Sequence, residues 1–117
     1  MFHYKSPAKL NLFLKVLNKR VDGFHNIQSI FQLIDFYDYL SFEKRKDNKV
    51  KITCNVKNLE VNNIIEIAIE LFRKKFNIKK YGLNIKLKKN IPIGAGLGGG
   101  SSNAATTLIA LAKIWNI

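Results

Sequence analysis

The sequence predicts an α+β fold, a mixed sheet packed on helices, and three observations lead to that prediction. Apolar and polar residues alternate through the first half of the chain, which indicates extended strands. From about residue 63 the apolar residues take helical spacing. A further alternating segment and a glycine-rich loop then lead into an Ala-rich second helix, so the predicted order is strands, helix, strand, loop and helix.

The strands are predicted from alternation and from the turns between them. Residues 9–17 alternate, residues 18–23 contain an Asp-Gly pair that suits a tight reversal, and residues 27–35 continue as a mostly apolar extended run. Residues 38–44 and 50–54 are shorter candidates separated by a charged link, and they predict a hairpin.

Two helices and one more strand follow. The first helix begins near Asn63, where Asn62 or Asn63 can cap it, and ends within residues 77–82. Residues 83–87 alternate as a half-buried strand. Residues 102–115 form the second helix, which is Ala-rich and apolar enough to be well buried.

Length and composition indicate a single domain. At 117 residues and 47% hydrophobic content, the chain is long enough for a modest core of its own. The single cysteine, Cys54, excludes an intrachain disulfide and a cysteine-based zinc site, which favours a reducing, cytoplasmic setting. The N-terminus lacks the apolar core of a signal peptide, and no segment stays free of charge for the roughly 18 residues of a membrane span. We therefore expect one cytoplasmic domain without a membrane partner.

The chain is also strongly basic, with 20 Lys and Arg against 8 Asp and Glu and a net charge of +12. Such a charge is typical of proteins that bind nucleic acid, anionic lipid or an anionic small substrate. Most of the bases are dispersed lysines, and Asn and Ile are abundant too, which is what an A/T-rich coding bias produces without a functional cause. We expect no nucleic acid partner, and a basic RNA-binding module or an inactive remnant stays as the alternative to an enzyme.

The segment from Pro92 to Asn103 is dense in glycine and runs directly into the second helix. Glycines let backbone N–H groups converge, and the N-terminus of a helix turns its unpaired N–H groups and its positive dipole end toward the same point. A Walker P-loop is excluded, because the residue after Gly99 is Gly100 where that motif needs lysine. A dinucleotide fingerprint fits the glycine spacing but lacks the acidic residue about twenty positions on.

A third phosphate motif fits the same segment better. Pro92, Gly96 and the run from Leu97 to Ala105 resemble the phosphate-binding motif of the GHMP small-molecule kinases. The segments Ser6–Leu14 and Arg20–His25 are similar to the first two signatures of one branch of that family. The three motifs follow in the family's order, and together they cover essentially the whole chain but only the first part of the family's length.

This resemblance implies the GHMP-kinase N-terminal fold, which is like domain 2 of ribosomal protein S5, with residues 1–117 as the ATP-binding domain. It implies ATP-dependent phosphorylation of the 2-hydroxyl of 4-diphosphocytidyl-2-C-methyl-D-erythritol, with Mg²⁺, in non-mevalonate isoprenoid (terpenoid) biosynthesis. The family's catalytic aspartate and second domain have no counterpart here, so we expect a domain incomplete at its C-terminal end and little or no activity from it alone. A homodimer stays open.

The resemblance also implies roles for residues near the N-terminus. Lys9 would be catalytic, because its ammonium near the accepting hydroxyl would stabilise charge on the transferring phosphoryl group. Asn11, two residues further on the same strand face, would hydrogen-bond the substrate, and Phe24 and His25 would contact the cytosine by stacking and hydrogen bonding. The family commonly has Tyr where this chain has Phe24.

The remaining implied residues form the ATP site. They are Pro92, Ile93, Gly94, Ala95, Gly96, Leu97, Gly98, Gly99, Gly100, Ser101, Ser102, Asn63, Ile64 and Lys89. Four of them have a second interpretation: Asn63 as a helix cap, Ile64 as a core residue, and Ser101 and Ser102 as caps of the last helix, with Ser102 also a candidate Mg²⁺ contact. Lys89 reaches either the nucleotide or solvent.

Overall fold

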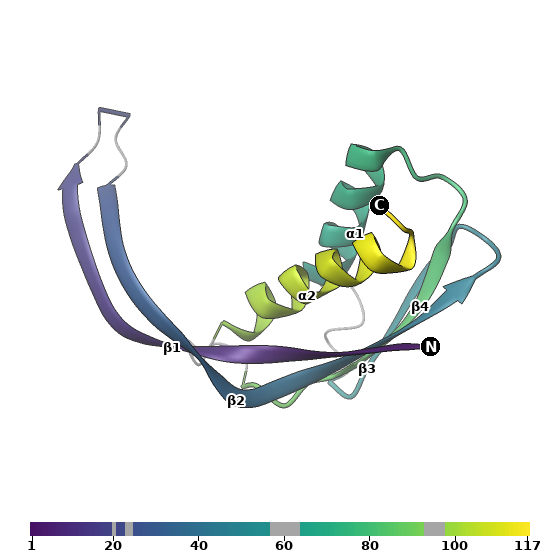
Figure 1. The fold of residues 1–117 in the computed structure, drawn as a ribbon, viewed down its shortest axis with the longest axis horizontal. Coiled ribbons are helices and arrows are strands. Elements are labelled where there is room, and N and C mark those ends of the chain that lie inside the picture. Colours follow the sequence, from purple (N-terminus) through teal and green to yellow (C-terminus); the bar gives the residue numbers. More distant parts are fainter. Residues whose placement is uncertain (20, 23–24, 57–63, 93–97) are drawn as a thin grey trace.

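The computed structural model describes residues 1–19, 21–22, 25–56, 64–92 and 98–117, and for residues 11–17, 19 and 25–31 it describes the backbone only. The elements, in chain order, are β1 (Phe2–Lys19), β2 (His25–Arg45), β3 (Val50–Cys54), α1 (Ile64–Phe76), β4 (Gly82–Lys88) and α2 (Gly99–Ile114). The predicted α+β fold is confirmed. Figure 1 shows both helices on one side of the sheet, while β1 and β2 continue beyond it as a long curved hairpin.

The sheet has four strands in the order β1-β2-β4-β3. β1 pairs antiparallel with β2, and β2 pairs antiparallel with β4. β3 runs parallel to β4, and α1 makes the connection between these two strands. Parallel neighbours need such a crossover, because a tight turn can join only antiparallel strands.

The predicted hairpin between residues 38–44 and 50–54 is wrong. The chain does reverse between them, but β4 lies between β2 and β3. Ile85 of β4 pairs with Phe42 on one side and with Ile52 on the other, so the alternating apolar residues of β4 are covered from both directions. A central position buries more of this strand's apolar surface than an edge position would.

The two predicted strands 27–35 and 38–44 are parts of one strand, β2. Pro7 pairs with Tyr37 and the next residue, Ala8, pairs with Ile34, so two additional residues of β2 are accommodated at this point. Proline has no N–H to give to a ladder, which explains why it lies at a register shift. The predicted boundary between residues 35 and 38 is therefore a bulge inside a continuous strand.

The core lies between the sheet and the two helices. It is formed by Leu40, Phe42, Ile52, Ile65, Ile69, Phe72, Leu83, Ile85, Leu87, Ala110, Leu111 and Ile114. α1 ends at Phe76, where the predicted 77–82 segment begins. The next residue, Asn77, has a φ of 54°, which asparagine tolerates well, and the N–H of Ile78 donates to the carbonyl of Arg73. Among the described residues no helix is long and apolar enough to cross a membrane.

Candidate phosphate-binding site

Residues from β1 and from the segment after β4 meet the N-terminus of α2. The glycine-rich loop leads into this end of the helix. The helix begins at Gly99, three residues earlier than predicted. Gly98 precedes it as the N-cap residue in the left-handed conformation, with φ 67° and ψ 25°, and among the described residues the cap makes no side-chain hydrogen bond to the first turn. The N–H groups of an uncapped first turn have no partner within the helix, so they are available to an anion. Residues 93–97 of the predicted ATP site lie outside the described residues.

Lys9 reaches this helix end from β1. A Cβ placed on Gly98 would lie 2.6 Å from Cε of Lys9 and 2.9 Å from its Cγ. The methylenes of the lysine therefore lie directly against the Gly98 backbone, at the last turn of chain before α2. The structure thus brings together the lysine of the first sequence motif and Gly98 of the third, although 88 residues separate them in the sequence.

Lys89 reaches the same helix end from the segment after β4. A Cβ on Gly99 would lie 2.8 Å from its ammonium nitrogen, and its Nζ donates to Oδ2 of Asp38 at 2.7 Å and to Oδ1 of Asn103 at 3.0 Å. The side chain of Lys89 is only 7% exposed and that of Asp38 is fully buried. The interpretation of Lys89 as a solvated lysine is therefore wrong, and the nucleotide interpretation stays a prediction.

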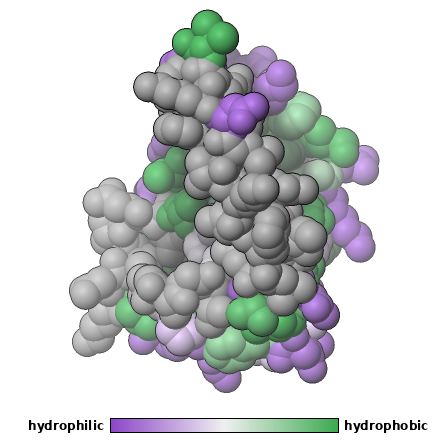
Figure 2. All heavy atoms as spheres, turned by 90° about the vertical axis from the view of Figure 1, so that its left-hand side faces the viewer, coloured by the Kyte–Doolittle hydropathy of each residue, from purple (hydrophilic) through white to green (hydrophobic). Residues whose placement is uncertain are grey.

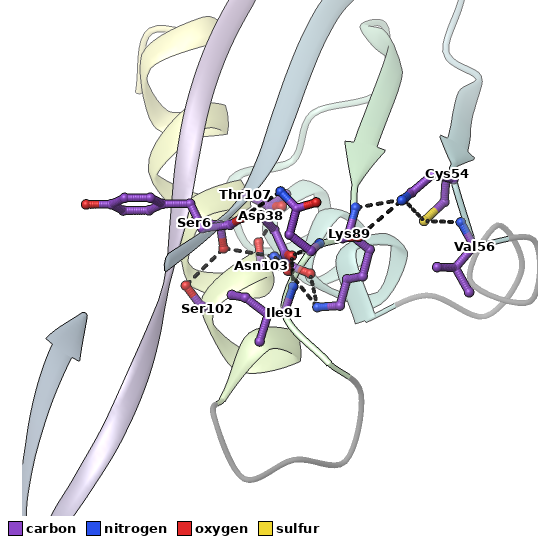
Figure 3. A network of polar contacts seen from close by, with 12 residues as sticks. Ser6, Asp38, Cys54, Val56, Lys89, Ile91, Ser102, Asn103 and Thr107 are labelled. Atoms are coloured by element: carbon purple, nitrogen blue, oxygen red, sulfur yellow. Dashed lines mark hydrogen bonds and ion pairs between the residues drawn. The ribbon is translucent and has the colours of Figure 1, made fainter. Parts of the chain in front are cut away.

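Asp38 is the centre of a buried polar network between β2, the end of β4 and α2 (Figure 3). Its Oδ1 accepts the backbone N–H groups of Asn90 at 2.6 Å and Ile91 at 2.8 Å, and its Oδ2 accepts Lys89 and the side-chain amide of Asn103. Burial alone would raise the pKa of Asp38. The hydrogen bonds from Ile91, Lys89, Asn90 and Asn103 outweigh burial and hold the pKa below its ordinary value. A carboxylate this well solvated by donors is a weak base.

The network continues from Asn103 to the first turns of α2. The amide nitrogen of Asn103 donates to Oγ of Ser6 at 2.8 Å, and the Ser6 hydroxyl donates to Oγ of Ser102 at 2.9 Å. Ser102 lies inside the helix, since its own N–H donates to the carbonyl of Gly98. The expected capping role of Ser101 and Ser102 is therefore wrong, because the helix starts before them and an uncapped glycine occupies the N-cap position.

The other predicted site residues divide into three groups. Gly100 and Ser101 are exposed in the first turn of α2, where Gly99 is buried, and Pro92 is exposed in the segment that follows β4. Ile64 is 41% exposed at the start of α1, so its interpretation as a core residue is wrong. The side chains of Asn11 and His25, and all of Phe24 and Asn63, lie outside what the structure describes.

Sequence reasoning missed Asp38, Asn103 and the hydroxyl of Ser6 as members of the site. A signal for Asp38 was present, because on a strand it shares a face with Leu40 and Phe42, both of which are buried. A carboxylate on the buried face of a strand requires partners that neutralise and hydrogen-bond it. The identity of those partners could not be found from periodicity, since they come from segments more than fifty residues away.

The assembled site has the chemistry of an anion binder. Two lysines from different segments flank the uncapped N-terminus of α2, and glycines let a ligand approach its backbone. Within the described part of the chain no group of three or more His, Cys, Asp or Glu side chains could hold a metal ion. A divalent cation here would depend on hydroxyl and phosphate oxygens, and Ser102 offers a hydroxyl at the N-terminal end of α2.

Comparisons with known proteins agree with this geometry. Residues 63–117 match the family described as the N-terminal domain of GHMP kinases. A 4-diphosphocytidyl-2-C-methyl-D-erythritol kinase of Prochlorococcus marinus (strain MIT 9301) is 55% identical over 115 residues, which are 97% of this chain and 37% of that relative. The enzyme of the same name from Francisella philomiragia is 52% identical over 110 residues, 93% of this chain and 40% of the relative.

Solved structures have the same arrangement. The crystal structure of a 4-(cytidine 5'-diphospho)-2C-methyl-D-erythritol kinase superposes with a TM-score of 0.81 at 33% identity, over 97% of this chain and 41% of that one. The mevalonate kinase of Methanococcus jannaschii superposes with a TM-score of 0.73 at 18% identity, over 98% of this chain and 40% of that one, which shows a shared fold. The chain thus spans about two fifths of the length of the proteins it matches.

Proposed function

We propose that residues 1–117 form the ATP-binding part of a small-molecule kinase. The premise is that the chain has the N-terminal domain fold of the GHMP kinases. The observation that carries the proposal is the contact of Lys9 with Gly98 at the uncapped N-terminus of α2. Phosphoryl transfer needs a cradle for the donor phosphates and a positive charge beside the transferring group. This helix end and this lysine supply the two requirements at one place.

The proposed substrate is 4-diphosphocytidyl-2-C-methyl-D-erythritol, phosphorylated on its 2-hydroxyl with ATP as donor in isoprenoid (terpenoid) biosynthesis in the cytoplasm. The support is the identity of 55% and 52% to two kinases of that name. Asn11, Phe24 and His25 are the proposed substrate contacts. Mg²⁺, when bound with ATP, would neutralise charge on the phosphates, and Ser102 is this chain's candidate contact to it.

The proposed division of labour follows from the geometry. The N–H groups at the start of α2 would bind phosphate oxygens, as helix N-termini generally do. The ammonium of Lys9 would stabilise the negative charge that develops as the phosphoryl group moves. Asp38 is not the proposed base, because both of its oxygens are occupied by hydrogen-bond donors and its side chain is fully buried.

Binding of ATP is the first test. Isothermal titration of the 117-residue chain with ATP and Mg²⁺ should give a Kd of about 1 mM or tighter, within the range common for enzyme substrates. GTP and free phosphate serve as comparison ligands. The absence of any ATP binding by a folded chain would contradict the proposal.

Turnover is the second test. The chain alone and a fusion, in which the remaining length of the 55% identical Prochlorococcus relative follows residue 117, should be compared in a coupled ADP-release assay. We expect the fusion to release ADP with 4-diphosphocytidyl-2-C-methyl-D-erythritol and not with mevalonate or homoserine. A fusion that folds and binds ATP but phosphorylates mevalonate instead would contradict the proposed substrate and still support the proposed kinase activity.

A further inference from the structure

We propose that Asp38 is a positioning residue for the phosphate cradle, by which we mean residues 98–102 at the start of α2: it ties the segment that follows β4 to this helix and, through Asn103 and Ser6, orients the hydroxyl of Ser102. The inference rests on the proposed function, since it concerns the cradle of that same site. Asp38 lies on β2, an element that contributes no residue to the glycine-rich loop itself. Its side chain is fully buried, so it acts through its neighbours and not by contact with a ligand.

The first step is that one carboxylate holds both ends of the loop. Oδ1 accepts the N–H groups of Asn90 and Ile91, which lead into the loop. Oδ2 accepts the amide of Asn103, which is on α2 just after the loop. Because the same rigid group binds both segments, it fixes the position of the start of α2 relative to the end of β4, and with that the place of the helix N–H groups that would meet a phosphate.

The second step concerns the packing of Lys89 against the start of α2. Its ammonium lies next to the Gly99 backbone, where it donates to both Asp38 and Asn103. A buried ammonium keeps its place only with a paired anion and hydrogen-bond acceptors. Asp38 therefore keeps Lys89 against the first turn of α2, and the close approach of this ammonium explains why the helix begins with a residue that has no side chain.

The third step is the direction of the hydrogen bonds that lead to Ser102. Asn103 uses its two amide hydrogens on Asp38 and on Ser6, so Ser6 accepts and its own hydroxyl hydrogen is left for Ser102. Ser102 accepts in this pair, which leaves its own O–H to donate to a phosphate oxygen. The chain from Asp38 to Ser102 thus sets a hydroxyl donor at the helix end.

Removal of the carboxylate should act locally, because other bonds hold the end of β4. The backbone N–H of Lys89 donates to Oδ1 of Asn55 at 2.7 Å, and the side-chain amide of Asn55 donates to the carbonyl of Lys89 at 3.1 Å. These bonds do not involve Asp38. We therefore expect Asp38→Asn to leave the sheet in place while it loosens the contact between the start of α2 and the segment after β4.

The experiment compares three variants of the 117-residue chain by titration with ATP and Mg²⁺ and by amide NMR. Asp38→Asn removes the charge, Ser6→Ala removes the hydroxyl that links Asn103 to Ser102, and Asp47→Asn is the matched control, an exposed carboxylate paired with Arg45. We expect about tenfold weaker ATP binding for Asp38→Asn, about threefold for Ser6→Ala, and a change under about twofold for the control. The amides of Asn90 and Ile91 should exchange faster in Asp38→Asn.

The folded fraction of each variant separates positioning from general instability. A chain that is partly and reversibly unfolded binds ATP more weakly only in proportion to its folded fraction, which urea denaturation gives. A displaced cradle weakens the Kd beyond that proportion. An unchanged Kd with unchanged amide signals from Gly98 to Ser102 in a folded Asp38→Asn chain would overturn the inference. If Asp38→Asn does not fold, the Kd for ATP and the amide signals of Ser6→Ala test the inference in its place. If the unmodified chain binds no ATP, the proposed function fails, and the amide signals still decide whether Asp38 orders the cradle.

Discussion

The methylenes of Lys9 lie against the backbone of Gly98, so closely that a Cβ on Gly98 would be 2.6 Å from Cε of the lysine. A real Cβ contact of this length does not occur, and Gly98 also has a φ of 67° that L-residues with side chains rarely adopt. The absence of a side chain at Gly98 therefore allows both the left-handed backbone conformation and the close approach of Lys9. Substitutions of Gly98 and of Lys9 test the conformation and the lysine separately.

Gly98→Ala should lower the free energy of unfolding by about 1–3 kcal/mol, the usual cost of a left-handed conformation for a residue with a side chain. Gly100→Ala is the matched control, because a Cβ there meets nothing within 4 Å and alanine favours a helix. Urea denaturation of the two variants measures the difference. Equal stability of the two variants would contradict the described conformation of Gly98.

Lys9→Met tests the charge of the lysine separately from its packing, since methionine keeps most of the methylene contact with Gly98. In the fusion enzyme we expect kcat to fall by roughly 10²- to 10³-fold, the typical effect of removing one group that stabilises transition-state charge. The Kd for ATP should change little. Turnover that stays close to the unmodified rate would remove Lys9 from the catalytic role.

Gly82→Ala should destabilise the sheet strongly. A Cβ at this position would fall on the carbonyl oxygen of Lys49 and lie 2.8 Å from its backbone nitrogen, and the same carbonyl accepts the N–H of Leu83. Backbone atoms cannot move aside as a flexible side chain can, so the link between β2 and β3 must shift. We expect a loss of about 2 kcal/mol or more in urea denaturation, against a gain or no change in Gly100→Ala.

Acid should destabilise the chain through Asp38. Its pKa in the folded chain is below its ordinary value of 3.8, so its contribution to stability is complete above that value and is lost as pH falls through the lower, folded pKa. The free energy of unfolding should therefore decrease as the pH is lowered below about 4. The same measurement on Asp38→Asn should give a shallower decrease, and an equal slope would contradict the assignment.

The outer faces of the helices predict self-association of the chain. Ile67 and Leu71 are on one face of α1 and are 53% and 63% exposed, and Ile109 of α2 is 65% exposed. Figure 2 shows that hydrophobic side chains also come to the surface in several places on the face that it presents. Ile67→Lys combined with Leu71→Lys should shift sedimentation toward monomer without loss of stability, since both side chains face solvent. Unchanged association would exclude this face as the contact.

The strand and helix content could be predicted because it depends on short-range patterns. The alternation of residues 83–87 and the helical spacing after residue 63 correspond to β4 and α1. Strand order depends on which strand buries the most apolar surface against its neighbours, and this is a property of the assembled sheet. The sequence therefore indicated a reversal after residue 44 but not that β4 lies between β2 and β3.

The same distinction applies to the candidate site. The glycines, Lys9 and the motif order were enough for the sequence by itself to determine the kinase family it resembles and to predict a phosphate site at the start of the last helix. Only the tertiary structure decided that Lys89 is buried with Asp38 and Asn103, and that Ser102 accepts a hydrogen bond from Ser6. A motif specifies the local backbone, whereas the partner of a buried charge is set by segments that come together only when the sheet and α2 pack.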